Sequence, residues 1–230
     1  MVSPTEMAKP RFSAVAFDLD GTLYPASGLY VRLVPFLLKN QRLLRVMGRV
    51  RNRLRKSGAY SGDFYELQAH LMGEVLGEPS EIVKEKTERL IYRGWEPFFK
   101  TIKLFPHLRE TLDAFRGAGI PMGLLSDFPT EGKLQNMGLA DYWNATHCSE
   151  QSGRLKPDPL SFLELAEKMG ERPENMLYVG NNPRYDVKGA AAAGMSAALI
   201  LPRWRKCPAA LRKAAFVFHG YRQLRDYVLN

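Results

Sequence analysis

Two aspartates, Asp18 and Asp20, stand two residues apart in the stretch FDLDGTLY. In extended backbone, side chains at this spacing point the same way, so both carboxylates could reach one site. Two carboxylates this close repel each other, and a hard cation such as Mg²⁺ suits such oxygen ligands. One carboxylate could then attack phosphorus while the other moves protons. Taken alone, the pair could also be a surface turn.

Three later stretches carry polar groups that suit the same chemistry. GLLSDF carries Ser126 and Asp127 at the end of a predicted strand, where the Ser126 hydroxyl and neighbouring backbone N–H groups could hold a phosphoryl oxygen. GRLKPDP places Lys156 in a proline-containing loop, where a fixed positive charge could face developing negative charge. YVGNNPRYD carries Asn181 and, five residues later, Asp186. Taken singly, a serine at a strand end is more often a turn residue, and most lysines are solvated surface charges.

Short apolar runs precede most of these polar groups and have the composition of buried parallel strands. We expect strands in FSAVAF, GIPMGLLS, NMLYVG and MSAALIL. Helices are expected in PHLRETLDAFRGAG and DPLSFLELAEKMG, which have apolar residues at helical spacing and end in glycine. This alternation from about residue 105 onward predicts an α/β fold, a parallel sheet with helices on both faces.

Residues 28–100 interrupt the alternation, because they show helical patterns and no convincing strand. One helix is expected in the basic stretch 39–56, and another from Asp63, which has capping-box spacing to Glu66, to Gly77. A third helix is expected to follow Pro79 and Ser80. The aromatic stretch GWEPFFK is expected to pack where the insertion returns to the core, and one of its rings could line a substrate pocket.

Asp-x-Asp-Gly-Thr, then Ser, then Lys-Pro, then Gly-Asn-x4-Asp form an ordered set that resembles the haloacid dehalogenase superfamily of hydrolases. The resemblance implies a Rossmann-like core, residues 1–27 and 101–230, with a helical cap inserted at 28–100. By matching positions, it implies that Asp18 is the nucleophile and Asp20 the general acid and base. Dehalogenases resemble this pattern less well because they lack the second aspartate, so Asp20 favours phosphoryl transfer.

The resemblance also implies which residues bind phosphate and metal. Ser126, Asp127 and Lys156 would bind the phosphoryl group, and Lys156 would also orient the nucleophile. Mg²⁺ would be held by Asp18, the Asp20 carbonyl, the residue at 181 and Asp186 through a water molecule. Family members usually have aspartate where this chain has Asn181, whose amide oxygen can coordinate a hard cation but adds no charge. We therefore expect a working but weakened Mg²⁺ site.

The expected function is that of a Mg²⁺-dependent phosphatase acting on a small phosphorylated metabolite through an aspartyl-phosphate intermediate. Two alternatives stay open. One is a binding protein that keeps the fold but has lost catalysis, which Asn181 could indicate. The other is a phosphotransferase or phosphomutase, which would move phosphate to an acceptor other than water.

The formal net charge of +9 comes from one segment, since residues 31–56 hold nine arginines and lysines and no acidic residue. A basic amphipathic helix can bind nucleic acid, another anionic partner or a membrane surface, but a cap helix with its arginines in water is the favoured interpretation. The sequence shows no membrane span or secretory signal, so we expect a cytoplasmic protein. Cys148 and Cys207 are expected as free thiols.

Overall fold

The computed structural model describes residues 11–57, 62–205 and 207–230. Within them, six parallel strands form one sheet in the order β3-β2-β1-β4-β5-β6. The strands are β1 (Ala14–Phe17), β2 (Met122–Ser126), β3 (Ala145–Cys148), β4 (Met176–Gly180), β5 (Ser196–Ile200) and β6 (Phe216–Phe218). This arrangement confirms the predicted α/β fold with a Rossmann-like core. The strand order reverses at β1, and open parallel sheets bind ligands at the carboxyl ends of the strands at such a point.

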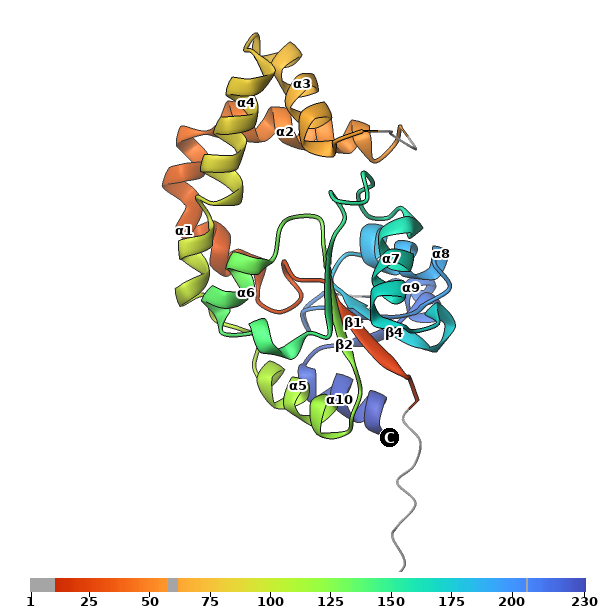
Figure 1. Ribbon diagram of the computed structural model, residues 1–230. Coiled ribbons are helices and arrows are strands. Elements are labelled where there is room, and N and C mark those ends of the chain that lie inside the picture. Colours follow the sequence, from red (N-terminus) through yellow and green to blue (C-terminus); the bar gives the residue numbers. More distant parts are fainter. Residues whose placement is uncertain (1–10, 58–61, 206) are drawn as a thin grey trace, which may run out of the picture.

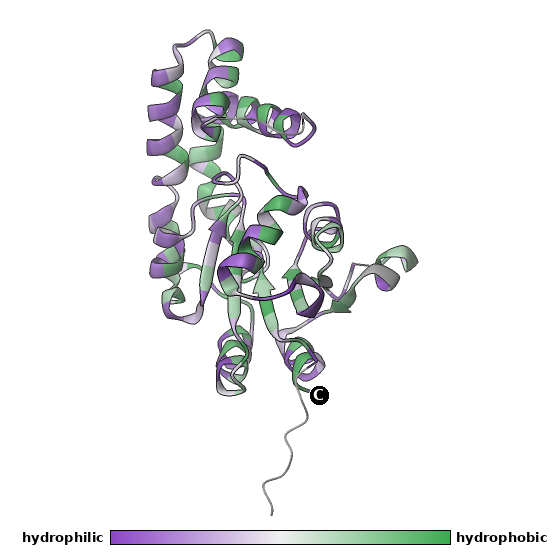
Figure 2. Ribbon diagram, turned by 45° about the vertical axis from the view of Figure 1, so that its right-hand side comes forward, coloured by the Kyte–Doolittle hydropathy of each residue, from purple (hydrophilic) through white to green (hydrophobic). Residues whose placement is uncertain are grey.

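Strand β1 separates two hydrophobic clusters, one on each face of the sheet. Its Val15 and Phe17 side chains pack into one cluster, and its Ala14 and Ala16 side chains pack into the other. Helices cover both faces: α5 (Leu108–Gly117) and α10 (Tyr221–Leu229) the first, α7 (Pro159–Met169) and α8 (Lys188–Ala192) the second. Figure 2 shows the strands in hydrophobic colours between helices that carry both kinds of residue. The burial of both faces explains why the strands are apolar along their length.

Two strands have no counterpart among the predicted ones. Strand β3, with the sequence ATHC, contains polar residues and its first two residues are only partly buried. Strand β6 has three residues and lies at the edge of the sheet. Strand β3 lacks the apolar run by which a buried strand is found in a sequence, whereas β6 lies in the short apolar run AAFVF, which was not assigned as a strand. The helices that follow β2 and β5 are α6 (Glu131–Met137) and α9 (Ala209–Ala214).

The stretch between β1 and α5 is helical, as predicted, and is called the cap below. It comprises α1 (Ala26–Lys39), α2 (Gln41–Leu54), α3 (Phe64–Leu76), α4 (Ser80–Thr87), a π-helical turn (Glu88–Tyr92) and a 3₁₀ turn (Glu96–Thr101). Its described residues contain no strand. The cap stands over the carboxyl ends of the strands, where it is orange to yellow in Figure 1. It therefore lies where it can cover a site at that edge of the sheet.

Helix α3 begins and ends where the sequence predicts. The Asp63 carboxylate accepts hydrogen bonds from the backbone N–H groups of Tyr65 (2.7 Å) and Glu66 (3.1 Å). Gly77 ends the helix in the left-handed conformation, with φ of 70°. Both ends follow the capping preferences of helices. The cap also has a hydrophobic cluster of its own, formed by Leu43, Val46, Met47, Val50, Met72, Leu76, Val83 and Ile91.

The two ends of the cap lie side by side. The Phe105 backbone N–H donates a hydrogen bond of 3.0 Å to the Leu23 carbonyl, which joins the chain entering the cap to the chain leaving it. Leu29, Leu33 and Phe99 pack into a cluster of the sheet and not into the cluster of the cap. The division into a core of residues 1–27 and 101–230 and a cap of residues 28–100 remains a proposal.

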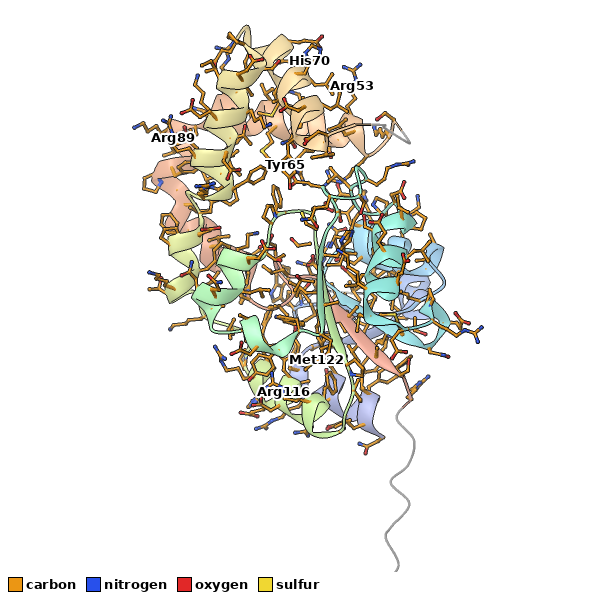
Figure 3. All side chains as sticks on the ribbon, viewed as in Figure 1. Arg53, Tyr65, His70, Arg89, Arg116 and Met122 are labelled. Atoms are coloured by element: carbon orange, nitrogen blue, oxygen red, sulfur yellow. The ribbon has the colours of Figure 1, made fainter. Side chains whose placement is uncertain are left out.

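Helix α2 carries the basic stretch, and its two faces differ. Leu43, Met47 and Val50 are buried. The predicted basic stripe is exposed, and it consists of Arg42, Arg45, Arg49, Arg53 and Lys56. Figure 3 shows Arg53 pointing away from the core. The favoured interpretation is a cap helix with its arginines in water, and binding of an anionic partner by this stripe stays an untested alternative.

Other features agree with the sequence. None of the described helices is long and apolar enough to cross a membrane. Cys148 and Cys207 are free thiols, and Cys148 is buried.

Candidate active site

The parallel register brings the ends of three strands together. Phe17 at the end of β1 lies opposite Leu124 of β2 and Val179 of β4. The backbone N–H of Asp18 continues this ladder with a hydrogen bond of 2.8 Å to the Val179 carbonyl. Polar residues that follow the three strands therefore share one edge of the sheet.

A buried lysine bridges two carboxylates at this edge. Lys156 Nζ lies 2.6 Å from Asp18 Oδ1 and 2.9 Å from Asp186 Oδ1, and all three residues are buried. The Thr22 hydroxyl donates to the other oxygen, Asp18 Oδ2, at 2.8 Å. Lys156 also donates to the Tyr178 hydroxyl at 3.3 Å. Both oxygens of the predicted nucleophile are thus held in place, and Lys156 contacts the carboxylate that it was predicted to orient.

Burial and charge act in opposite directions on this cluster. Burial raises the pKa of the Asp18 carboxyl to about 7, with Lys156 opposing the rise and Asp186 adding to it. Burial would lower the pKa of the Lys156 ammonium, but Asp18 and Asp186 outweigh it and raise that pKa well above its usual range. Lys156 therefore stays protonated, and its charge favours the carboxylate form of Asp18 that a nucleophile needs.

Asp20 has a different environment from Asp18. Its side chain is 34% exposed. Its oxygens accept hydrogen bonds from Lys133 Nζ, at 2.9 and 3.2 Å, and Oδ1 also accepts one from the Tyr24 hydroxyl. A carboxylate that is held by donors yet reachable can exchange a proton with a bound molecule. Lys133 comes seven residues after Ser126 and follows no sequence pattern that singles it out, so it was not predicted.

Asn181 lies beside the Asp20 backbone. Its Nδ2 donates a hydrogen bond of 3.2 Å to the Asp20 carbonyl. The second oxygen of Asp186 accepts from the backbone N–H groups of Asn181 and Asn182, at 3.0 and 2.8 Å. Gly21 has a φ of 88°, and a Cβ on it would stand 1.9 Å from Asn181 Nδ2. Glycine is therefore needed after Asp20, both for the backbone conformation and for the space that the amide fills.

These oxygens fit a hard divalent cation. The Asn181 side-chain amide lies at the Asp20 carbonyl, and the Asn181 backbone N–H lies at the Asp186 carboxylate; the amide oxygen would face the Asp20 carbonyl if the amide group turned over. Among the described residues, no group of three or more His, Cys, Asp or Glu side chains could hold a metal by itself. Carbonyl, amide and substrate oxygens would have to complete the ligand set, and the weakened Mg²⁺ site stays a prediction.

Ser126 ends β2 and Asp127 follows it, but their side chains make different contacts. Ser126 is buried, and its Oγ accepts a hydrogen bond of 3.1 Å from the Phe128 N–H. Asp127 accepts from the Lys156 backbone N–H at 3.0 Å and from Arg55 at 2.7 Å. Burial alone would raise the pKa of Asp127, but Lys156, Arg51 and Arg55 outweigh it and lower that pKa. Both oxygens of the Asp127 side chain are thus engaged, and a role of Asp127 in phosphoryl binding stays a prediction.

Two arginines reach the core from the carboxyl end of α2, Arg51 in its last turn and Arg55 directly after it. Arg51 is buried and forms an ion pair with Glu150, and it donates to the Asp127 carbonyl at 2.9 Å. Arg55 donates to the Lys156 carbonyl at 3.0 Å. The cap is thereby tied to the loops that carry the predicted phosphoryl-binding residues. Neither contact was predicted, because nothing in the basic stretch separates these arginines from their exposed neighbours.

A pocket of about 110 Å³ opens beside Asp20, between the cap and the core. Asp20 and Lys133 lie on its wall together with aromatic side chains of both parts, including Tyr92 and Trp95 of the cap and Phe128 after β2. Trp95 belongs to the aromatic stretch that was predicted to pack at this junction.

Comparison with known proteins places these observations in a family. A family model described as haloacid dehalogenase-like hydrolase matches residues 12–194. The phosphoglycolate phosphatase of Escherichia coli (strain K12) is 28% identical over 200 residues, which cover 78% of this chain and 77% of that enzyme. The enzyme of the same name from Salmonella typhi is 26% identical over the same shares of both chains.

Solved structures agree on the fold. A HAD phosphatase from Thermococcus onnurineus superposes with a TM-score of 0.62 at 23% identity, covering 93% of this chain and 96% of that one. A 2-haloacid dehalogenase from Pseudomonas syringae pv. Tomato DC3000 superposes with a TM-score of 0.63 at 24% identity, over the same shares. Both the ordered motifs and the family match lead to one assignment: the chain belongs to the haloacid dehalogenase-like hydrolases.

Proposed function

We propose that the chain is a Mg²⁺-dependent phosphatase that hydrolyses a small phosphorylated metabolite through an aspartyl-phosphate. The observation that carries the proposal is the contrast between two neighbouring carboxylates. Asp18 is buried with both oxygens held, by Lys156 and Thr22, whereas Asp20 is partly exposed beside a pocket. A fixed nucleophile and a reachable acid are what two-step ester cleavage requires. The presence of Asp20 also favours phosphate esters over the substrates of dehalogenases.

Asp20 transfers a proton in each of the two steps. In the first, an Asp18 oxygen bonds to phosphorus, the bond from phosphorus to the ester oxygen breaks, and Asp20 gives its proton to that oxygen. In the second, Asp20 takes a proton from water while the water oxygen bonds to phosphorus. The bond between Asp18 and phosphorus then breaks and inorganic phosphate forms. Lys156 keeps a positive charge beside the phosphoryl oxygens throughout.

Mg²⁺ bound here would add positive charge against the phosphoryl oxygens. The need for it follows from the charges around the site. With Asp20 protonated for the first step, the carboxylates of Asp18 and Asp186 face two ammonium groups, of Lys133 and Lys156. An incoming phosphate monoester adds further negative charge, so a cation is required to balance it.

Release of phosphate from p-nitrophenyl phosphate and from 2-phosphoglycolate, measured against Mg²⁺ concentration, tests the proposal. 2-Phosphoglycolate is included because the curated relatives are named for its hydrolysis. We expect turnover that needs the metal and disappears in Asp18→Asn. Silence of the wild type at high Mg²⁺ would favour a binding protein, and phosphate moved to an added alcohol would favour a phosphotransferase.

Asn181→Asp tests the metal site directly. The variant places a fourth carboxylate beside Asp20, so the Mg²⁺ concentration for half-maximal turnover should fall about tenfold. An unchanged titration would mean that residue 181 does not touch the metal.

A further inference from the structure

We propose that Lys133 makes the enzyme select phosphate esters whose leaving group carries a carboxylate or another acidic group. This inference rests on the proposed function, because it concerns the part of the substrate that leaves when the ester is cleaved. Lys133 belongs to none of the four motifs that identify the family.

Lys133 is a buried cation with one acidic partner. It is 7% exposed, and the described residues give its ammonium a single ion pair, with Asp20. Aromatic rings flank the ammonium, with the centroids of Phe99 and Phe128 each 5.3 Å from Nζ. Burial of a lysine against aromatic rings is costly in desolvation, so its position calls for a function or a strong partner.

The pocket beside Asp20 gives Lys133 access to a bound molecule. Among the described residues that line this pocket, Lys133 is the single cation and Asp20 the single carboxylate. An ammonium has three N–H donors, and the two oxygens of Asp20 engage at most two of them. At least one donor is therefore available to a ligand. Helix α6, which carries Lys133, lies beside the lower end of the cap in Figure 1.

The position and size of the pocket define the rest of the ligand. Asp20 is the proposed proton donor to the ester oxygen, so the space beside it must hold the leaving group. At about 110 Å³, the pocket is well below the roughly 300–1,000 Å³ of sites for drug-sized ligands. A carboxymethyl group suits it, whereas a nucleoside would need the cap to move. The substrate class that follows is the short phosphorylated acid.

Two matched esters test the selectivity. 2-Phosphoglycolate carries a carboxylate at the position where 2-hydroxyethyl phosphate carries a neutral hydroxymethyl group. For the wild type we expect kcat/KM to favour the acid by roughly 10- to 100-fold, the usual range for a hydrogen bond to a charged group. Lys133→Met should bring the ratio close to 1, and Lys133→Arg should keep much of it. Lys100→Met, which removes an exposed lysine of the cap, should leave the ratio unchanged.

The ratio separates binding of the leaving group from an effect on Asp20. Loss of Lys133 changes the surroundings of Asp20 for every ester, and that common effect cancels between the two substrates. Equal kcat/KM for both esters in the wild type, or an equal loss for both in Lys133→Met, would overturn the inference while leaving the phosphatase proposal intact.

If neither ester nor p-nitrophenyl phosphate is turned over, the proposed function fails and calorimetric binding decides the inference. Tighter binding of 2-phosphoglycolate than of 2-hydroxyethyl phosphate, lost in Lys133→Met, would support selection by Lys133. Equal binding of the two would refute it.

Discussion

Two buried charge clusters meet at this site, and they are built in different ways. In the first, Lys156 bridges Asp18 and Asp186, and all three residues follow strands or loops of the sheet. In the second, Arg51 and Arg55 of the cap bind Glu150 and Asp127 of the core. In the proposed mechanism the first cluster fixes the reacting groups, and the second cluster ties the cap to the core beside them. Substitutions in the first cluster should therefore lower the rate of hydrolysis strongly, whereas substitutions in the second cluster should mainly lower stability.

The largest effect is expected from Lys156→Met. It leaves Asp18 and Asp186 buried without a counter-charge, so the free energy of unfolding should fall by about 3–5 kcal/mol. Hydrolysis should fall by about 1,000-fold, because the charge that faces the phosphoryl oxygens is lost. Urea unfolding and phosphate release measure the two effects, with the exposed Lys188→Met as control. Near-normal turnover in Lys156→Met would remove this lysine from the mechanism.

Arg51→Met should separate stability from chemistry. Its partner Glu150 has a fully buried side chain, and the unpaired carboxylate should cost about 3 kcal/mol of unfolding free energy. Hydrolysis should fall much less than in Lys156→Met, because no reacting group is changed. Adding Glu150→Met to the variant should restore part of the stability in a double-mutant cycle. A double variant no more stable than Arg51→Met alone would argue against a buried pair.

Two glycines allow the core and the cap to be compared at the backbone. Gly21 in the core and Gly77 in the cap both have positive φ, at 88° and 70°. A Cβ at Gly21 would strike Asn181, whereas a Cβ at Gly77 would have no atom within 4 Å. Gly77→Ala should therefore cost only the left-handed conformation, about 1–2 kcal/mol of unfolding free energy, with hydrolysis unchanged. Gly21→Ala should cost more and lower hydrolysis as well, and equal behaviour of the two would contradict the contact with Asn181.

The smallest effect is expected from Arg55→Met. The Arg55 and Asp127 side chains are 15% and 11% exposed, so their ion pair should contribute about 1 kcal/mol. Because Asp127 also accepts from the Lys156 backbone, hydrolysis should fall a few-fold. Arg53→Met, on the exposed stripe of the same helix, should change stability by no more than about 0.5 kcal/mol. Thermal unfolding and initial rates are measured for the two variants side by side. Equal losses of stability and activity in both would contradict a contribution from the ion pair between Arg55 and Asp127.

The sequence predicts the core better than the cap contacts for a physical reason. Asp18 and Asn181 come directly after an apolar strand and Ser126 is the last residue of one, and the parallel sheet brings such positions together. Strand β3 escapes prediction because it lacks an apolar run. Arg51 and Lys133 escape it because their partners, Glu150 and Asp20, lie 99 and 113 residues away in the sequence. Pairs at such separations are set by tertiary packing, which no local pattern records.

The hydrogen bond between Phe105 and Leu23 has a consequence for how such enzymes can diversify. The cap is an insertion whose two ends lie side by side. Because the entropy cost of closing such a loop grows only slowly with its length, the cap can be lengthened or replaced at little cost in stability. Leu29, Leu33 and Phe99, which pack against the sheet, are the anchors that a replacement would have to keep. With them retained, one contiguous graft could give the same hydrolytic core a new substrate range.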